Sequence, residues 1–208
     1  FQNSTQGGSL TTSVSPVSVT LGYVEATSGS GSVITNTTAV ASNNMSLVAS
    51  KPTVTVAAGG TDSLNLGALS KLGEFTIAAD TNGKIAVAST SISLSYVGVT
   101  GAELATSTLV LKDGGTSVTG VNYSTFYSST TPVLTFTTPY EIAAGTSKTF
   151  SLYGTVNGSA QQGIVPRVNS SLTSGATFKW VDVIGGNTAQ TGASIYNFPT
   201  NSYTSKSN

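Results

Sequence analysis

The chain contains no cysteine and no histidine. Without cysteine there are no disulfides, and without either residue nucleophilic catalysis of the Ser-His or Cys-His kind is excluded. Transition metals are disfavoured too, because imidazole and thiolate are ligands they favour. The DTNGK segment at 80–84 offers Asp80 and Asn82 but lacks the later ligands of a calcium loop, so it indicates a glycine-closed turn.

The acidic residues do not indicate an active site either. A glycosidase needs two carboxylates at a defined separation, whereas these side chains lie far apart in the sequence and mostly beside turns. They are Glu25, Asp62, Glu74, Asp80, Glu103, Asp113, Glu141 and Asp182. Among so many serines, no local spacing marks out a Ser-Lys pair. We therefore expect no catalytic residue, no metal, no cofactor and no enzymatic activity.

Charge is also scarce. Eight basic and eight acidic residues cancel, and charged residues make up 8% of the chain, against about 25% in a typical globular domain. No basic cluster is present, which argues against nucleic acid as a partner. No apolar run approaches the ~20 residues of a membrane span. Serine and threonine, 66 of the 208 residues, provide a hydroxylated surface instead.

These features together predict an extracellular protein of the cell surface. A chain rich in Ser, Thr and Gly, poor in charge and free of cysteine is typical of prokaryotic surface proteins. The first residue is Phe1 rather than Met, so we expect a mature product whose leader has been removed.

Helical periodicity is nearly absent, and alternation of apolar and polar residues is widespread. It predicts strands at 53–57, 74–79, 91–99, 107–112, 132–138, 148–156 and 176–184. Glycine-containing turns separate them, for example KDGGT at 112–116 and AAGTS at 143–147. The expected fold is all-β, an antiparallel β-sandwich of the Ig-like or jelly-roll kind with an extended N-terminal strand.

We expect two parts in the chain: an N-terminal extension at 1–27 and a sandwich body at 28–208. The alternative is two smaller tandem β domains, because 52–67 and 139–154 share a proline, a strand ending in AAG and a second strand. No linker of suitable composition separates these two segments, which favours one body.

The N-terminal strand pattern, TTSVSPVSVTLGYVEA at 11–26, has one apolar face. Its apolar side chains are Val14, Val17, Val19, Leu21 and Tyr23. The alternation shifts by one position at Pro16, between Val14 and the other four. A polar leader precedes the strand, and SGSGS at 28–32 has the composition of a flexible linker. Such a strand can pair within its own sandwich, or it can add to a sheet of the next subunit.

In these features the chain resembles subunits of extracellular filaments joined by donor-strand complementation, such as archaeal threads and bundling pili and bacterial biofilm-matrix fibres. The resemblance depends on the helix-free N-terminus, the 11–26 strand and the Ser/Thr/Gly-rich sandwich, and it implies a homopolymer. Unlike type IV pilins, the chain opens with no long hydrophobic helix. Further partners under this interpretation are other cells or surface glycans.

Six Asn-x-Ser/Thr sequons are candidate N-glycosylation sites: Asn3, Asn36, Asn44, Asn122, Asn157 and Asn169. With so many hydroxyl residues, chance alone supplies about four. The single tryptophan, Trp180, lies in a predicted strand, and we expect it to be a sandwich residue rather than a platform for a ligand.

Two functions remain open from the sequence. The first is a structural subunit of a cell-surface filament, polymerised head to tail by insertion of the N-terminal strand into the neighbour. The second is an S-layer component or an adhesive, carbohydrate-binding β-sandwich module, because a fold does not fix a function.

Overall fold

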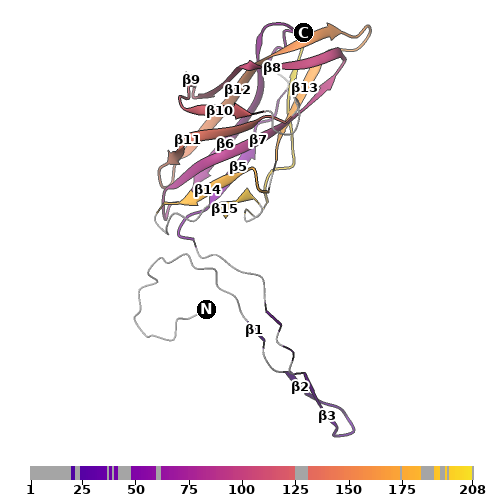
Figure 1. Cartoon of the computed structure of the whole chain (residues 1–208), viewed down its shortest axis with the longest axis vertical. Coiled ribbons are helices and arrows are strands. Elements are labelled where there is room, and N and C mark those ends of the chain that lie inside the picture. Colours follow the sequence, from indigo (N-terminus) through magenta and orange to yellow (C-terminus); the bar gives the residue numbers. More distant parts are fainter. Residues whose placement is uncertain are drawn as a thin grey trace. The chain divides into compact units, whose positions relative to one another are not determined.

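A computed structural model of the chain describes residues 20–21, 24–36, 38, 40–41, 48–59, 62–124, 131–173, 175–183, 190–192, 195 and 197–207. The chain divides into two compact units, the N-terminal unit (residues 1–48) and the body (residues 49–208). Figure 1 labels most of the strands of both units. Among the described residues, the strand pairs are antiparallel, and the bridge between Ser63 and Lys206 is parallel.

The N-terminal unit contains two short strand pairs. β1 (Thr20–Leu21) pairs with β4 (Val40–Ala41), and β2 (Val24–Thr27) pairs with β3 (Val33–Asn36). The SGSGS segment joins β2 to β3 as a hairpin turn, in which the Ser28 amide donates to the Ser32 carbonyl at 2.8 Å. Composition alone had suggested a flexible linker there; the pairing of the flanking strands turns it into a hairpin loop.

One sheet of the body has five strands in the order β5-β6-β12-β8-β9. Their bounds are β5 (Pro52–Val56), β6 (Leu69–Ala79), β12 (Ser147–Ala160), β8 (Val99–Asp113) and β9 (Thr116–Ser117). Burial alternates along β6 and β12, as expected where one face of a sheet is dry and the other is wet. On β6 the alternation of buried and exposed residues shifts by one position at Leu72. Leu72 forms a bulge, because no residue of β12 pairs with it.

The second sheet has seven strands. Its main path is β10 (Val121–Ser124), β11 (Val133–Ile142), β7 (Ile85–Val97), β13 (Arg167–Leu172) and β16 (Tyr203–Lys206). β14 (Lys179–Asp182) pairs with the first half of β7, and β15 (Gln190–Thr191) pairs with β14. β7 is therefore the central strand of this sheet.

An aromatic cluster joins the two sheets. Phe75 of β6 stacks on Phe150 of β12 with ring centroids 5.5 Å apart. From the opposite sheet, Tyr140 and Phe136 of β11 approach the Phe150 ring at 5.2 and 6.3 Å. Phe150 is fully buried, so it lies at the centre of the core and holds both layers together. The prediction of an all-β, antiparallel sandwich is thus confirmed.

Most of the predicted strands are present, with shifted ends. The strand predicted at 91–99 is wrong at its end, because β7 stops at Val97 and β8 starts at Val99. Gly98 turns the chain between them with φ of 68°, a conformation that favours glycine. The turn predicted at AAGTS is confirmed, with Gly145 at φ of 67° between β11 and β12. IGGNT at 184–188, another glycine-containing segment after a predicted strand, lies outside the described residues.

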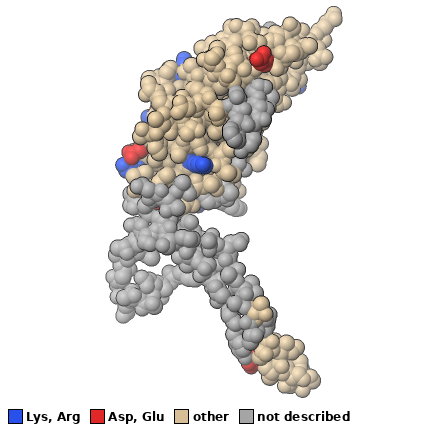
Figure 2. Space-filling view, viewed as in Figure 1, with Lys and Arg blue, Asp and Glu red and all other residues tan. Residues whose placement is uncertain are grey.

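The surface carries few charges. On the face shown in Figure 2, the blue and red atoms of charged residues are sparse on a largely tan background. Trp180, as expected, belongs to the sandwich: it is 2% exposed on β14, next to the buried Phe178 and Asp182 of the same strand parity.

Candidate functional site

Most of the predicted interface strand lies outside the described residues: Val14, Val17, Val19 and Tyr23. Leu21 is described in β1, where its backbone pairs with Val40 of β4. Within residues 11–26, the described strands are the two-residue β1 and the beginning of β2, and both pair inside the N-terminal unit. The sheets of the body are formed by β5 and the strands that follow it.

Of the sequons, Asn3 and Asn44 lie outside the described residues, and Asn36 ends β3. Asn122 on β10 and Asn157 on β12 are exposed. Asn169 on β13 is half-buried, and its side-chain oxygen accepts a hydrogen bond from Thr204 at 2.8 Å. The structure does not bring these residues together.

The two halves of β7 are paired differently. From Ile85 to Ser91, β7 has β11 on one side, and from Ile85 to Ser89 it has β14 on the other. From Ile92 to Val97 it pairs with β13, in an unbroken register. On the β11 side the last described contact is the Ile92 amide, which donates to Pro132 O at 3.2 Å. Beyond it, no described residue pairs with Ser93–Val97 on that side.

The backbone of this second half has a defined direction. Amide and carbonyl groups of successive residues in an antiparallel ladder point to opposite sides. Since the Ile92 amide points toward β11, those of Leu94 and Tyr96 point the same way, whereas Ser93 and Ser95 face β13. We call this edge of Ser93–Val97, on the side away from β13, the β7 edge.

Tyr96 has an unusual phenol. Its hydroxyl is buried and has no hydrogen-bond partner among the described residues. Burial raises the pKa of Tyr96 to about 12, so the phenol is neutral in ordinary conditions. A buried hydroxyl without a partner costs free energy, of the order of 1–3 kcal/mol.

Two clusters of polar side chains hold strands of the body together. Asp113 Oδ2 accepts hydrogen bonds from Tyr140 at 2.7 Å and from Lys148 at 2.8 Å. Burial raises the pKa of Asp113, but the bonds from Lys148 and Tyr140 outweigh it and hold this pKa below its usual range. The cluster ties the end of β8 to β11 and β12.

The second cluster surrounds Lys71 of β6. Its Nζ lies 2.7 Å from Glu74 and 3.6 Å from Asp62, which accepts a hydrogen bond from the Tyr203 hydroxyl. Burial lowers the pKa of Lys71, but the bond and charge of Glu74 outweigh it and raise this pKa. Ser151 also donates to Glu74 at 2.9 Å. These contacts fasten β16 against the five-stranded sheet.

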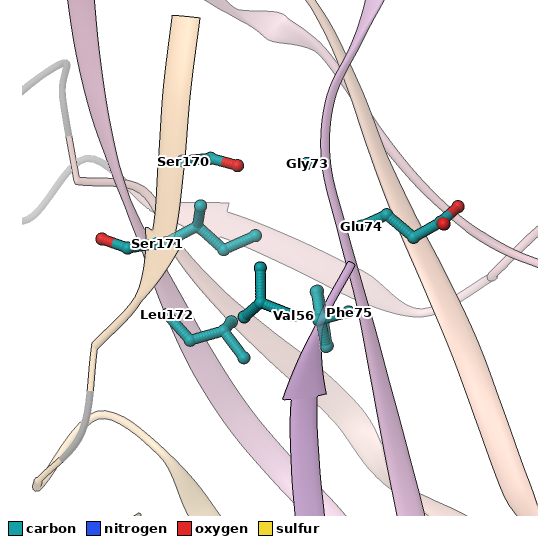
Figure 3. A pocket seen from close by; sticks show the side chains of 8 residues that line it. Val56, Gly73, Glu74, Phe75, Ser170, Ser171 and Leu172 are labelled. Carbon is teal, nitrogen blue, oxygen red and sulfur yellow. The ribbon is translucent and has the colours of Figure 1, made fainter. Parts of the chain in front are cut away.

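A small cavity of about 10 Å³ lies between β6 and β13. Figure 3 shows Gly73 opposite Ser170 and the side chains of Val56, Phe75 and Leu172 around the space, with Glu74 pointing away. The volume suits one water molecule at most. It is a packing void rather than a ligand site.

In the part of the chain that the structure describes, no group of three or more acidic, histidine or cysteine residues could hold a metal ion. No helix of the described residues is long and apolar enough to cross a membrane. The DTNGK segment forms the predicted turn: Asp80 Oδ1 accepts the Asn82 amide at 3.0 Å and closes it.

Comparison with known proteins gives a limited result. No protein-family model matches the chain, and no curated protein matches it in sequence. Among solved structures it is similar to BcpA, the major pilin subunit of Bacillus cereus, at 10% identity and a TM-score of 0.38, over 90% of this chain and 48% of that one. A variant of BcpA matches with 10% identity and a TM-score of 0.34, over 82% and 46%.

The chain thus spans about half the length of these pilin subunits. At such TM-scores the likeness carries no argument about function, and the proposal below depends on the residues of this chain.

Among the described residues, the second half of β7 pairs with β13, and this could not be found from the sequence. The alternation predicts a strand at 91–99, but it does not show where the neighbouring strand stops. The signal that exists is Pro132, which cannot donate a backbone hydrogen bond and directly precedes β11.

Proposed function

We propose that this protein is a structural subunit of an extracellular cell-surface filament, in which the N-terminal strand of one subunit adds to a sheet of the next. One observation carries the proposal: the body closes its own core with strands from β5 onward, whereas β1 and β2 pair inside the N-terminal unit. We expect the apolar face that the sequence predicts at Val17, Val19, Leu21 and Tyr23 to be covered by such a partner.

Strand addition fits the chemistry of the chain. Backbone hydrogen bonds supply affinity, and alternate side chains supply specificity, so neither charge nor a cofactor is needed. A joint between the N-terminal strand of one copy and the body of the next is a heterologous contact, which produces an open filament if the rotation does not close. No enzymatic role is part of this proposal.

The experiment is negative-stain electron microscopy of the full-length protein and of a variant without residues 1–26. We expect filaments from the full-length chain and monomers from the truncated one, with unchanged circular dichroism of the body. Filaments should also resist SDS and heat. A full-length protein that stays monomeric, or a truncated one that still assembles, would contradict the proposal.

The exposed sequons extend this picture. Asn122 and Asn157 are accessible on their strands, whereas Asn169 accepts a hydrogen bond from Thr204 in the middle of a sheet. In a source organism with N-glycosylation, Asn122 and Asn157 are the expected glycan sites of the body. Mass spectrometry of glycopeptides tests this, and modification at Asn169 alone would contradict it.

One observation favours the second candidate, a carbohydrate-binding surface module. A surface hollow of about 510 Å³ is lined by five hydroxyl side chains, two carboxylates and two apolar residues: Thr116, Ser117, Thr119, Thr138, Tyr140, Asp113, Glu141, Val118 and Pro139. Hydroxyls and carboxylates are suited to hydrogen bonds with sugars. A glycan-binding screen distinguishes the two: binding that is lost in Glu141→Gln, by a protein that forms no filaments, supports the module.

A further inference from the structure

We infer that the β2–β3 hairpin of one copy docks on an exposed patch on the body of a second copy. The patch consists of Ile164, Val165, Arg167 and Lys206, and we call it the Arg167 patch. This inference rests on the proposed function, for which it names a contact between subunits in addition to the added strand. Opposite charges and exposed apolar side chains on the two surfaces carry it.

Two cations of the patch stand directly opposite each other. Arg167 of β13 pairs with Lys206 of β16, and both residues are exposed. Like charges in directly opposite positions of two strands are destabilising. In the described part of the chain no carboxylate forms an ion pair with either cation, whereas Lys71, Lys84 and Lys148 are paired with carboxylates. The arrangement therefore favours an anionic group from another molecule.

Exposed apolar side chains precede these cations in the chain. Ile164 and Val165 are 43% and 58% exposed, and Arg167 follows Val165 by two residues. Large apolar side chains that are exposed together and bordered by charge are typical of interaction sites. The patch thus combines positive charge with an apolar surface.

Backbone hydrogen bonds hold the loop that carries the apolar pair. At its start the Gln161 amide donates to Gly98 O at 2.9 Å, and at its end Pro166 O accepts from the Ser207 amide at 2.8 Å. Between them the Ile164 amide donates to Gln161 O at 3.2 Å and closes a turn. The apolar side chains are therefore presented by an anchored loop.

The hairpin carries the complementary groups. Glu25 pairs with Thr35 and Thr27 pairs with Val33. Because residues two apart on a strand share a face, Glu25 and Val33 lie on the same face of the hairpin. Both are exposed, Val33 by 55%. This face offers a carboxylate to the two cations and an apolar side chain to the apolar pair of the patch.

The spacing of the two surfaces agrees. Glu25 and Thr27, which lies opposite Val33, are two residues apart on a strand, a distance of about 7 Å. Val165 and Arg167 are also two residues apart, at most about 7 Å. A carboxylate placed on Arg167 would therefore bring Val33 to Val165. The apolar contact supplies affinity, whereas the ion pair, weak where it is exposed, selects the partner and the register.

A second copy is the occupant that the charges favour. Glu25 is the single charged residue of residues 1–48, so the eight basic and seven acidic residues of 49–208 give the body a net charge of +1. A contact between the N-terminal unit of one copy and the body of the next joins opposite charges. Because the two surfaces differ, the contact is heterologous and repeats from copy to copy, as strand addition does.

Zero-length cross-linking tests the contact with the natural residues. A carbodiimide joins a carboxylate and an amine in direct contact as an amide, with loss of water. An equal mixture of isotope-labelled and unlabelled full-length protein is treated, and its peptides are identified by mass spectrometry. We expect a link from Glu25 to Lys206 that joins labelled to unlabelled chains. Lys179, an exposed lysine of β14, is the control and should not be linked to Glu25.

Each other outcome contradicts a different statement. A link between Glu25 and Lys206 confined to single chains, or equal linking of Glu25 to Lys179, would overturn the inference. Filaments that form without the link would also overturn it, would leave the filament function intact and would assign the cations to a different anionic partner. A protein that stays monomeric and gives no link between chains would overturn the inference and the proposed function together.

Charge exchange gives an independent measurement. Glu25→Lys places a third cation against the patch, and should raise the protein concentration needed for assembly about threefold to tenfold. Adding Arg167→Glu and Lys206→Glu to this variant should restore the original concentration, because opposite charges meet again. Lys179→Glu is the control and should change nothing. A combined variant that assembles no better than Glu25→Lys alone would disprove the contact.

Discussion

The N-terminal unit and the body differ in how they hold their strands. The body packs two sheets around fully buried side chains such as Phe150, Leu152 and Phe178. The N-terminal unit has two-stranded pairs, and its hairpin exposes Val33 and Ile34 by 55% and 65%. Isolated two-stranded sheets are marginal in water. The difference indicates that the body has a stable core of its own, whereas the described strands of the N-terminal unit are held by pairing of two strands at a time.

The largest expected effect is on the core of the body. Phe150→Ala removes the ring that both sheets contact, and should lower the free energy of unfolding by about 3–5 kcal/mol. Urea denaturation of the unassembled protein measures it. Val33→Ala in the hairpin is the matched control and should leave the body transition unchanged. Equal losses from the two variants would remove the contrast between the units.

A methyl group added at Gly154 should have the next largest effect. A Cβ there would lie 2.9 Å from both Leu109 Cδ2 and Leu72 Cδ1, so Gly154→Ala forces side chains apart and should cost about 1–3 kcal/mol. Gly29→Ala, in the hairpin turn where nothing lies within 4 Å, is the control. A melting temperature lowered by Gly29→Ala but not by Gly154→Ala would contradict the tighter packing expected in the body.

The cluster at Asp113 predicts a pH dependence. Because the folded state lowers the pKa of this carboxyl, its charged form stabilises the body above pH about 4, and this stabilisation is lost as the pH falls through the folded pKa. Asp113→Asn should therefore lower the melting temperature at pH 7, with a difference that shrinks below pH 4. A constant difference at all pH values would disprove the linkage.

The smallest expected effect is that of a substitution in the hairpin of the N-terminal unit. Ile34→Ser replaces an exposed apolar side chain of the hairpin, and its effect on the unfolding of the body should stay within about 0.5 kcal/mol. Thermal melts followed by the fluorescence of Trp180, which lies inside the body, report on it. A clear loss of body stability would show that the hairpin contributes to the same core.

Sequence patterns predicted much of the body and little of its assembly. Alternation in EFTIAA and KTFSLYGTV located β6 and β12, because one dry face requires a period of two. It could not show that Gly98 divides 91–99 between two sheets, since a turn inside an alternating run leaves the alternation intact. The change of partner along β7, from β14 to β13, could not be predicted either, because strand pairing depends on segments that are distant in the sequence.

The sequence pattern also could not show which sequons are accessible on the surface. The pattern Asn-x-Ser/Thr is identical at Asn157 and Asn169, yet one side chain is exposed on β12 and the other is bonded to Thr204 between strands. Only the arrangement of the sheets distinguishes them.

The most direct test of strand addition between subunits is competition by a peptide with the sequence of residues 11–26. The full-length protein is allowed to assemble with increasing amounts of this peptide or of a peptide with the same residues in scrambled order, and filament lengths are measured by electron microscopy. If the body accepts the strand of a neighbour, the native peptide caps growing ends and filaments shorten with its concentration, while the scrambled peptide has no effect. Equal filament lengths at every concentration of both peptides would contradict the account.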